Sequence, residues 1–347
     1  VAEAGLSVGA QAGEGVVRAT GFGTARVTAA VGAARGDIDV TVTRPETESD
    51  GFTVLGSGLA GSYTSDLWVH GEYAYTGTGP WWSCGGPEDP CDAREGRLFV
   101  WRLLADGGLE KVDSLALPAP HVNDVKVSAD GTFAVASQEN GTAGEGGIVL
   151  IDLTNPAAPS IVSTFTEDLE GGVHNTWIER IDGRDYVFVV EDGGSAGGLH
   201  VVDVTDRTAP TSVARYYGGS SLVHDVYVRD GLAFVSHWNY GLVILDVGNG
   251  MTGGSPENPT EVGRVVTAGG HVHNAWYWPE GAKVFVGEEQ FIRTDGTGSV
   301  GVMHVVDVSD MTAPVEVAHF GVPGTTPHNF WMDEDRGILY AAWYEQG

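Results

Sequence analysis

The chain has 347 residues, of which 47 are Asp or Glu and 18 are Lys or Arg, so its formal net charge is −29. With 42% hydrophobic residues, 19% charged residues and 52 glycines, the composition is typical of a folded, turn-rich protein and excludes disorder as the main state. A chain this acidic, with only three lysines, is repelled by phosphate, which excludes nucleic acid as a partner. No run approaches the roughly 20 apolar residues of a membrane span, so we expect no transmembrane segment in this chain.

The first 44 residues are rich in Ala, Gly, Val and Thr, and the polar, proline-marked segment 45–51 is interpreted as a linker. Two strand-like runs, 15–29 and 38–42, accompany the turn sequence Gly21-Phe22-Gly23-Thr24-Ala25. Residues 1–44 thereby resemble the C-terminal part of a bacterial Ig-like group 2 domain. Such modules are typical of secreted and cell-surface proteins, so the resemblance implies an extracytoplasmic location: secreted, cell surface or periplasmic.

Two cysteines, Cys84 and Cys91, bracket a loop in which Gly and Pro favour tight turns. Such a loop can bring two sulfurs to bonding distance, and we expect a disulfide formed in an oxidising compartment. Zinc is the weaker alternative, because one Cys-x6-Cys pair lacks the second pair of ligands that a structural zinc site needs.

Six repeated units follow, each opening with a short polar signal that leads into an aromatic-rich strand. The Asp or Asn of each opening stands at Asp66, Asp124, Asn175, Asp225, Asn274 and Asn329, in steps of 49 to 58 residues. A second strand follows a Gly turn, and a third is a short apolar run that ends in Asp, as in Leu242–Asp246. A proline turn then leads to an outer strand. Four short strands in about 50 residues, repeated, predict an all-β fold, a propeller of four-stranded blades.

The apolar runs ending in Asp, followed by turns such as Thr205–Pro210 and Ser309–Pro314, resemble the LVIVD-repeat family of bacterial and archaeal surface propellers. The resemblance covers 52–347 and implies a surface protein. The blade around Leu98–Arg102 departs from the pattern, since Arg102 stands where other blades have Asp. The last blade is either incomplete or closed by strand 52–56. The sequence does not decide between a total of six blades and a total of seven.

Two columns of polar residues are expected to converge at one mouth of the central channel. The first opens the innermost strands and consists of Ser65, Asn123, His174, His224, His273 and His328. The second ends the second strands and consists of Thr78, Gln138, Glu191, His237, Glu288 and Trp343. Imidazoles joined by carboxylates are the ligands that zinc, copper and ferrous iron favour, so His174, His224, His273, His328, His237, Glu191 and Glu288 are candidate metal ligands.

The alternative interpretation is that the first-column residues cap tight turns, because Asn123 and Ser65 share the column with the histidines. His121 and His271 precede the openings by two positions and are expected in solvent or around the ligands. The Asp/Asn residues of the openings are expected to hold turns, and the aromatic residues two positions later to pack between blades. His70, His200, His304 and His319 lie outside the columns and are expected to be structural.

Further ligand contacts are expected from the irregularly placed tryptophans Trp81, Trp82, Trp238 and Trp343. The glycine-rich acidic loops at 191–195 and 294–299 offer oxygen ligands for calcium, a weaker signal because neither is an EF-hand loop.

Three functions remain open. The first is a secreted or surface propeller that binds a protein, a glycan or an ion as a binding or scaffold module. The second is a metal-dependent enzyme, an oxidoreductase or a hydrolase or lyase, in which Glu191 or Glu288 acts as the catalytic base. The third is a structural subunit of an extracytoplasmic assembly. The sequence favours the first, without deciding whether the protein is an enzyme.

Overall fold

The computed structural model describes the backbone of most of the chain and side chains from Thr53 onward. The described residues are 6–11, 14–19, 23–31, 34–42, 48–49, 52–58, 60, 64–78, 96–139, 146–169, 171–191, 198–218, 222–290, 301–322 and 325–344. Their regular structure consists of β-strands, which confirms the predicted all-β class. Within these residues no helix is long and apolar enough to cross a membrane.

Five four-stranded antiparallel sheets follow one another along the described chain, and in each the strands lie side by side in chain order. We call these sheets blades one to five. Blade one contains β7 (Thr64–His70), β8 (Tyr73–Thr78), β9 (Gly96–Leu103) and β10 (Leu109–Leu117). Blade two contains β11 (Val125–Val127), β12 (Phe133–Gln138), β13 (Gly147–Asp152) and β14 (Ser160–Phe165). Blade three contains β15 (Asn175–Ile181), β16 (Arg184–Glu191), β17 (Gly198–Asp203) and β18 (Thr211–Tyr216). Blade four contains β19 (Asp225–Arg229), β20 (Leu232–Ser236), β21 (Leu242–Asp246) and β22 (Thr260–Val265). Blade five contains β23 (Val272–Trp278), β24 (Lys283–Glu288), β25 (Met303–Asp307) and β26 (Val315–Phe320).

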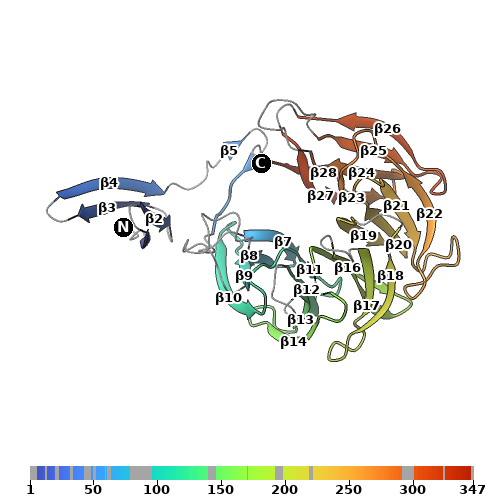
Figure 1. Ribbon diagram of the computed structural model, residues 1–347, viewed down its shortest axis with the longest axis horizontal. Coiled ribbons are helices and arrows are strands. Elements are labelled where there is room, and N and C mark those ends of the chain that lie inside the picture. Colours follow the sequence, from blue (N-terminus) through green and yellow to red (C-terminus); the bar gives the residue numbers. More distant parts are fainter. Residues whose placement is uncertain are drawn as a thin grey trace.

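Blade six has two described strands, β27 (Pro327–Asp333) and β28 (Ile338–Trp343), and β27 contacts β23 and β24 of blade five. The blades surround a central axis, with the first strand of each blade innermost and the last outermost, as in a β-propeller (Figure 1). The ring of ribbons is open between β7 and β28 (Figure 1). Segment 52–56 does not pair with β28: β6 (Phe52–Thr53) pairs with β5 (Glu48–Ser49), and Leu55 lies against Gly107 of blade one.

The repeated Asp residue ends the third strand of a blade by a local hydrogen bond. The Oδ1 atoms of Asp152, Asp203 and Asp307 accept the backbone N–H two residues later, at 2.9, 2.8 and 2.9 Å. Such a bond turns the backbone out of the sheet ladder. A β-bulge also interrupts the pairing of the third and fourth strands in blades two to five.

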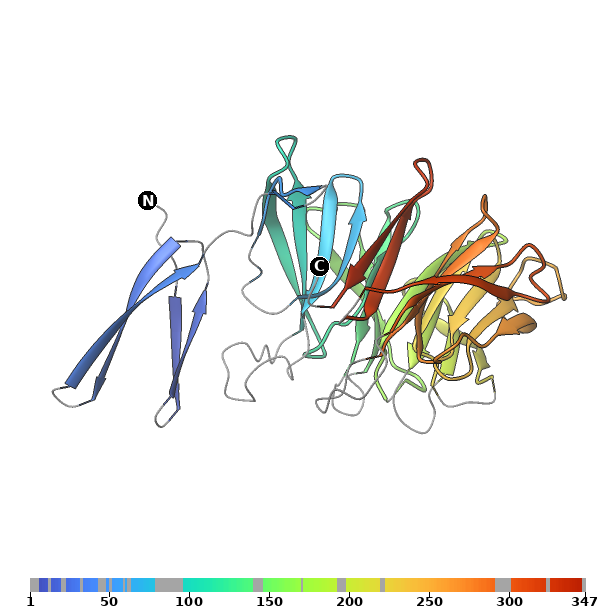
Figure 2. The ribbon, with the colours of Figure 1, turned by 90° about the horizontal axis from the view of Figure 1, so that it is seen from above.

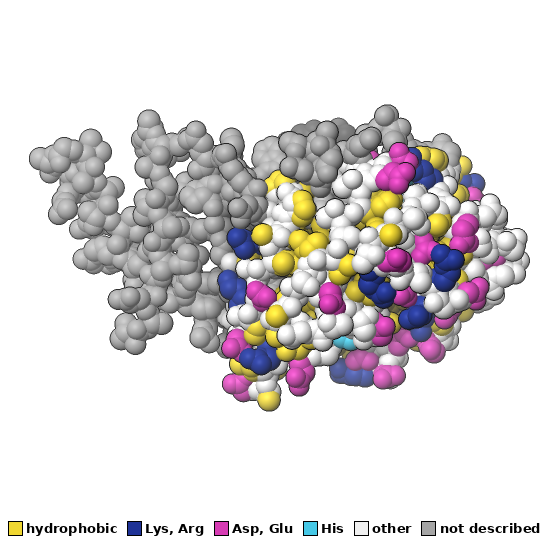
Figure 3. Space-filling view, turned by 90° about the horizontal axis from the view of Figure 1, so that it is seen from below, with side chains coloured by type: hydrophobic (Ala, Val, Ile, Leu, Met, Phe, Trp, Pro, Cys, Tyr) yellow, Lys and Arg dark blue, Asp and Glu magenta, His cyan; other side chains and the backbone are white. Residues whose placement is uncertain are grey.

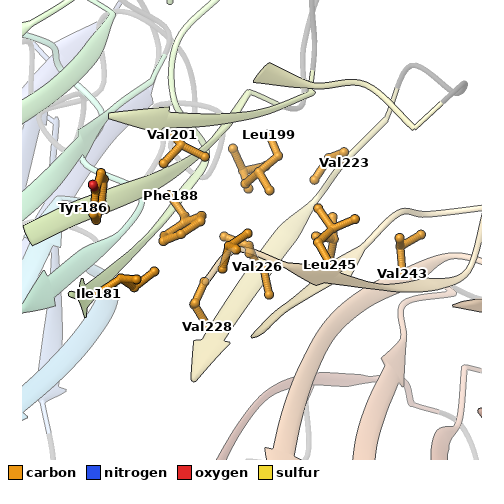
Figure 4. Close-up of a cluster of buried hydrophobic side chains, with 14 residues drawn as sticks. Ile181, Tyr186, Phe188, Leu199, Val201, Val223, Val226, Val228, Val243 and Leu245 are labelled. Carbon is orange, nitrogen blue, oxygen red and sulfur yellow. The ribbon is translucent and has the colours of Figure 1, made fainter. Parts of the chain in front are cut away.

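The hydrophobic core lies between neighbouring blades rather than at one centre. Between blades three and four, Phe188 and Val201 pack with Val226 and Leu245, each exposed by 1% or less (Figure 4). Burying a side chain of this size contributes about 1.5–3 kcal/mol. Equivalent clusters join blades one and two, two and three, and four and five.

Among the described residues, no blade packs against blade one on the side away from blade two, and the inner strand is more exposed there. Leu67 and Val69 of its inner strand are 57% and 51% exposed. The equivalent residues of blade four, Val226 and Val228, are each 1% exposed. The open side of the ring therefore carries an apolar face.

The first 42 residues contribute two separate two-stranded sheets, β1 (Leu6–Gln11) with β2 (Glu14–Ala19) and β3 (Gly23–Val31) with β4 (Ala34–Val42). Figure 2 shows both hairpins to one side of the propeller. The Ig-like resemblance of this segment stays a prediction. On the propeller surface in Figure 3, acidic side chains are interspersed with basic ones and histidine is nearly absent, because most of the histidines lie in the interior described next.

Candidate metal centre

Four histidines from consecutive blades form a continuous cluster at the channel mouth. His174, His224, His273 and His328 stand at or next to the starts of β15, β19, β23 and β27. Their ring centroids are separated by 4.6, 4.3 and 4.5 Å in that order. The first column thus converges as the repeat predicted.

The two non-histidine members of the first column bond to the neighbouring blade. Asn123 Nδ2 donates to the carbonyl oxygen of His174 at 2.9 Å, and the Ser65 hydroxyl donates to the carbonyl of Val122. These bonds link blades and do not cap local turns, so the capping interpretation stays a prediction.

Glu289 supplies a carboxylate to the cluster. One donor atom each from His224, His273 and Glu289 lie within 4.8 Å of one another, and Glu289 Oε1 is 3.8 Å from His273 Nε2. Two donors bound to one ion at about 2.1 Å are about 3.4 Å apart in a tetrahedral site, so the three side chains must move closer together to share an ion. Tyr344 fixes the carboxylate, since its hydroxyl donates to Glu289 Oε1 at 2.8 Å.

A second carboxylate, Glu139, holds the other side of the cluster. Its Oε1 lies 3.0 Å from His174 Nδ1, and its Oε2 lies 2.8 Å from Nδ1 of His121, which is 1% exposed. His121 is therefore a buried neighbour of the cluster rather than a solvent-facing residue.

The structure corrects the carboxylates expected from the second column. Glu191 and Glu288 point into their blades, 3.5 and 3.4 Å from Nε2 of His200 and His304 in the adjacent third strands. They also accept backbone N–H groups, Gly171 to Glu191 at 2.9 Å and Val302 to Glu288 at 3.3 Å.

Three other members of the second column also hold backbone segments, and the fourth packs against a ring. Gln138 accepts from Ala119 N at 2.7 Å, and His237 Nε2 lies 3.2 Å from the carbonyl of Tyr217. Thr78 donates to the carbonyl of Pro120 at 3.3 Å, and Trp343 packs against Phe320 at a centroid distance of 6.0 Å. Different side chains in one column thus perform one structural task, which is why their variation did not mark a site.

The residues that reach the cluster come one position later in the chain: Glu139, Trp238, Glu289 and Tyr344. Successive side chains of a strand point to opposite faces, so an error of one residue selects the wrong face. The period-2 alternation of the second strand is the sequence signal that would have found them.

Burial favours the neutral form of His224, His273 and His328. Burial, followed by the charge of His174, lowers the pKa of His224 to about 3, and burial followed by His174 lowers that of His328 to about 4. Burial and then His224 lower the pKa of His273 well below its usual value. Burial raises the pKa of Glu289. Neutral imidazole is the form that binds a metal, and a cation in the site would also stabilise the Glu289 carboxylate.

Proton positions can be assigned at His224. Its Nδ1 lies 3.2 Å from the carbonyl oxygen of His273, which can only accept. Nδ1 therefore carries the proton of the neutral ring, and Nε2 keeps a lone pair.

Below the histidines, the Asp/Asn column links neighbouring blades, whereas these residues were expected to hold turns. Asn175 donates to the carbonyl of His224 at 2.9 Å, and Asp124 accepts from Thr176 N at 2.9 Å. Lys126 stands among these carboxylates, contacting Asp66 at 3.0 Å and also Asp124.

An aromatic layer fills the channel at the next level. Trp177 of blade three lies 5.8 Å from Trp68 of blade one and 6.3 Å from Trp276 of blade five, and 4.5 Å from Tyr227 of blade four. Contacts between blades that are not neighbours cross the axis. The histidine cluster therefore lies above a filled channel.

Trp238 is the one predicted contact tryptophan that joins the cluster among the described residues. Its ring centroid is 5.2 Å from that of His224 and 5.0 Å from that of His271, on which it stacks. Trp238 and His271 have φ angles of 36° and 51°, in the left-handed region that bulky side chains avoid. Such strain persists where surrounding contacts hold it, and it is concentrated at functional sites.

Several predicted positions lie outside the described residues: Trp81, Trp82, Cys84, Cys91 and the loop 294–299, together with most of the loop 191–195. Their disulfide, ligand-contact and calcium predictions stay predictions.

Comparison with known proteins agrees with the repeat and the fold. The LVIVD repeat family matches residues 61–79, 184–217 and 221–267, within blades one, three and four. The chain carries LVIVD repeats. No curated protein sequence matches it significantly.

Similar solved structures are propeller proteins of low sequence identity. The periplasmic gluconolactonase of Pseudomonas aeruginosa is 14% identical with a TM-score of 0.58, over 97% of this chain and 88% of that one. Sqt1 of Chaetomium thermophilum is 15% identical with a TM-score of 0.54, over 81% and 66%. A putative 6-phosphogluconolactonase of Bacteroides fragilis is 11% identical with a TM-score of 0.55, over 88% and 80%. At these identities the likeness concerns the fold alone.

Proposed function

We propose that this chain is an extracytoplasmic binding propeller that holds a first-row transition-metal ion, zinc, copper or iron, at its channel mouth. The observation that carries the proposal is the convergence of donor atoms from His224, His273 and Glu289 to within 4.8 Å. Two imidazoles and a carboxylate match the preferences of these ions, and the absence of a cysteine among the three disfavours thiolate-seeking Cu(I).

Neighbouring groups support the same chemistry. Burial keeps His224 and His273 neutral, so they need not lose a proton to bind. Tyr344 holds Glu289, and Trp238 stacks beside His224, so the ligands are restrained by their neighbours. When bound, the metal would supply a Lewis-acidic centre for a protein, glycan or small-molecule partner.

The extracytoplasmic location is supported by three sequence features: the cysteine pair in a turn-rich loop, the Ig-like resemblance of residues 1–44 and the LVIVD repeats. One of the similar structures is that of a periplasmic gluconolactonase, which is compatible with this location.

A metal-dependent enzyme is the second candidate. Three protein donors leave coordination positions for water and substrate, as in catalytic zinc sites, whereas structural sites use four. In that case Glu289 is a ligand and Glu191 and Glu288 take no part, because both point into their blades.

The test is a titration with Co²⁺, whose visible absorption reports its ligands, on protein purified without a His tag. We expect one ion per chain and quenching of fluorescence from Trp238, which lies 5.2 Å from His224. The double variant His224→Ala/His273→Ala should lose both signals. The double variant His200→Ala/His319→Ala, which removes two histidines outside the cluster, should keep them. Absence of binding, or binding that survives in the first variant, would overturn the proposal.

A further inference from the structure

Glu139 lies between two imidazoles at one edge of the histidine cluster. Its carboxylate places Oε1 3.0 Å from His174 Nδ1 and Oε2 2.8 Å from His121 Nδ1. The side chains of Glu139, His174 and His121 are 13%, 19% and 1% exposed. One buried carboxylate thus faces the same ring atom of two histidines.

These contacts determine which nitrogen of each ring carries its proton. A carboxylate oxygen accepts hydrogen bonds, and the ring nitrogens are the groups that the two oxygens of Glu139 face. Each neutral imidazole facing it therefore carries its proton on Nδ1 and keeps the lone pair on Nε2. Asn123 Nδ2 also lies 3.2 Å from His174 Nδ1, but the carbonyl oxygen of His174 is nearer, at 2.9 Å, and accepts its hydrogen bond.

His174 is the one of the two that reaches the proposed ligands. Its ring centroid is 4.6 Å from that of His224, which contributes a donor atom to the three-residue group. Carboxylates that accept from the far nitrogen of a ligand histidine fix its tautomer and orientation.

We propose that Glu139 is a positioning residue of the metal centre, which holds His174 with its Nε2 lone pair available so that His174 is a further imidazole ligand beside His224, His273 and Glu289. The inference rests on the proposed function and deepens it, because it assigns a fourth protein ligand and the group that prepares it. His121 then shares the carboxylate without binding the ion.

Glu139→Gln is the sharp test, because it preserves shape but removes one of two acceptors. The amide NH2 of Gln must face one imidazole, and that ring must accept at Nδ1 and move its proton to Nε2, where it blocks a ligand. We expect the Co²⁺ dissociation constant to rise about 10- to 100-fold. Glu191→Gln is the matched control, since Glu191 is a buried glutamate beside a histidine but faces the blade interior. It should leave Co²⁺ binding unchanged.

Two background variants separate positioning from general support of the fold. In His174→Ala, binding should be weakened and the added Glu139→Gln change should have no further effect. In His121→Ala, His174 is the imidazole that still faces residue 139, and Glu139→Leu, which removes its acceptor, should still weaken binding. Equal losses in all backgrounds would overturn the proposal.

Nitrogen NMR of the unmutated, metal-free protein gives a readout that does not depend on any variant folding. At a pH where the His174 ring is neutral, we expect the signals of a ring protonated at Nδ1, and a ring protonated at Nε2 would contradict the inference. The same experiments distinguish a failure of this inference from a failure of the proposed metal-binding function. If unmutated protein binds Co²⁺ and His224→Ala/His273→Ala does not, while Glu139→Gln behaves as Glu191→Gln, only this inference falls.

Discussion

The histidine cluster at the channel mouth, called the rim below, and the interior of blade five use histidine and glutamate in two different ways. In the blade, Glu288 lies 3.4 Å from His304, whose other nitrogen is 2.9 Å from Glu316, so carboxylates flank one imidazole. At the rim, the next residue, Glu289, joins a run of four adjoining imidazoles. The two glutamates are neighbours in the chain, and Glu288 is the last residue of β24 whereas Glu289 follows it.

This difference separates charge balance from metal chemistry. The carboxylates of Glu288 and Glu316 on either side of the ring outweigh burial and raise the pKa of His304, which favours its cationic form. At the rim, burial and mutual repulsion lower the pKa of His224 and His328, which favours neutral rings with free lone pairs. In a buried pair of opposite charges, each group compensates the other. Adjoining neutral imidazoles instead have lone pairs that a cation can bind.

The largest expected effect concerns the layer just below the rim. In Lys126→Met, Asp66 and Asp124 lose the ammonium group that lies between them, and their buried charges are left uncompensated. Breaking a buried pair in this way costs about 3–5 kcal/mol of unfolding free energy, measured by urea denaturation. Lys283→Met is the matched control, because the Lys283 pair with Asp307 at 3.0 Å is partly exposed and contributes about 0–1 kcal/mol. Equal losses in the two variants would contradict this description of the channel.

A smaller effect should appear in the pH dependence of the metal-free protein. The unfolded chain binds a proton at His328 below pH 6.5, but the folded protein binds it only near its lowered pKa of about 4. The unfolded state therefore binds more protons in this window, and stability rises with pH by about 1 kcal/mol per unit between about pH 4 and 6.5. His328→Asn, which copies Asn123 of blade two, should lose this increment, seen as the difference between two urea series. A difference that is flat over this window would refute the neutral-rim assignment.

The smallest effects distinguish the two adjacent glutamates directly. Glu288→Gln should lower the unfolding free energy by about 1–2 kcal/mol, because the buried ion-pair contact with His304 at 3.4 Å is lost, and leave Co²⁺ binding unchanged. Glu289→Gln should weaken Co²⁺ binding at least about tenfold and leave stability nearly unchanged, because a buried carboxylate becomes neutral. The reverse pattern would return Glu288 to the metal centre.

The fold was predictable from the sequence because a blade repeats its signals. The apolar run ending at Asp203 or Asp307 recurs at a fixed place, and its local hydrogen bond ends the strand wherever it occurs. The sequence did not decide whether segment 52–56 closes the last blade. In the structure, Leu55 lies against Gly107 of blade one instead. A single strand-like segment carries no local signal that says which sheet it joins.

Half of the candidate site was predictable for the same reason. His174, His224, His273 and His328 share one position of the repeat, so symmetry alone brings them together. The carboxylates Glu139 and Glu289 were missed because the column was aligned one residue early, on Gln138 and Glu288. Where two glutamates are adjacent, composition does not distinguish them, and only the alternation of the strand does.

The most direct test is a crystal structure of the protein grown with Zn²⁺, with anomalous scattering data collected on both sides of the zinc edge. Our account predicts an anomalous peak about 2.0–2.2 Å from His224, His273 and Glu289 donor atoms, with Glu288 still against His304. A channel mouth without a peak, or a peak bound by Glu288 or Glu191, would contradict it.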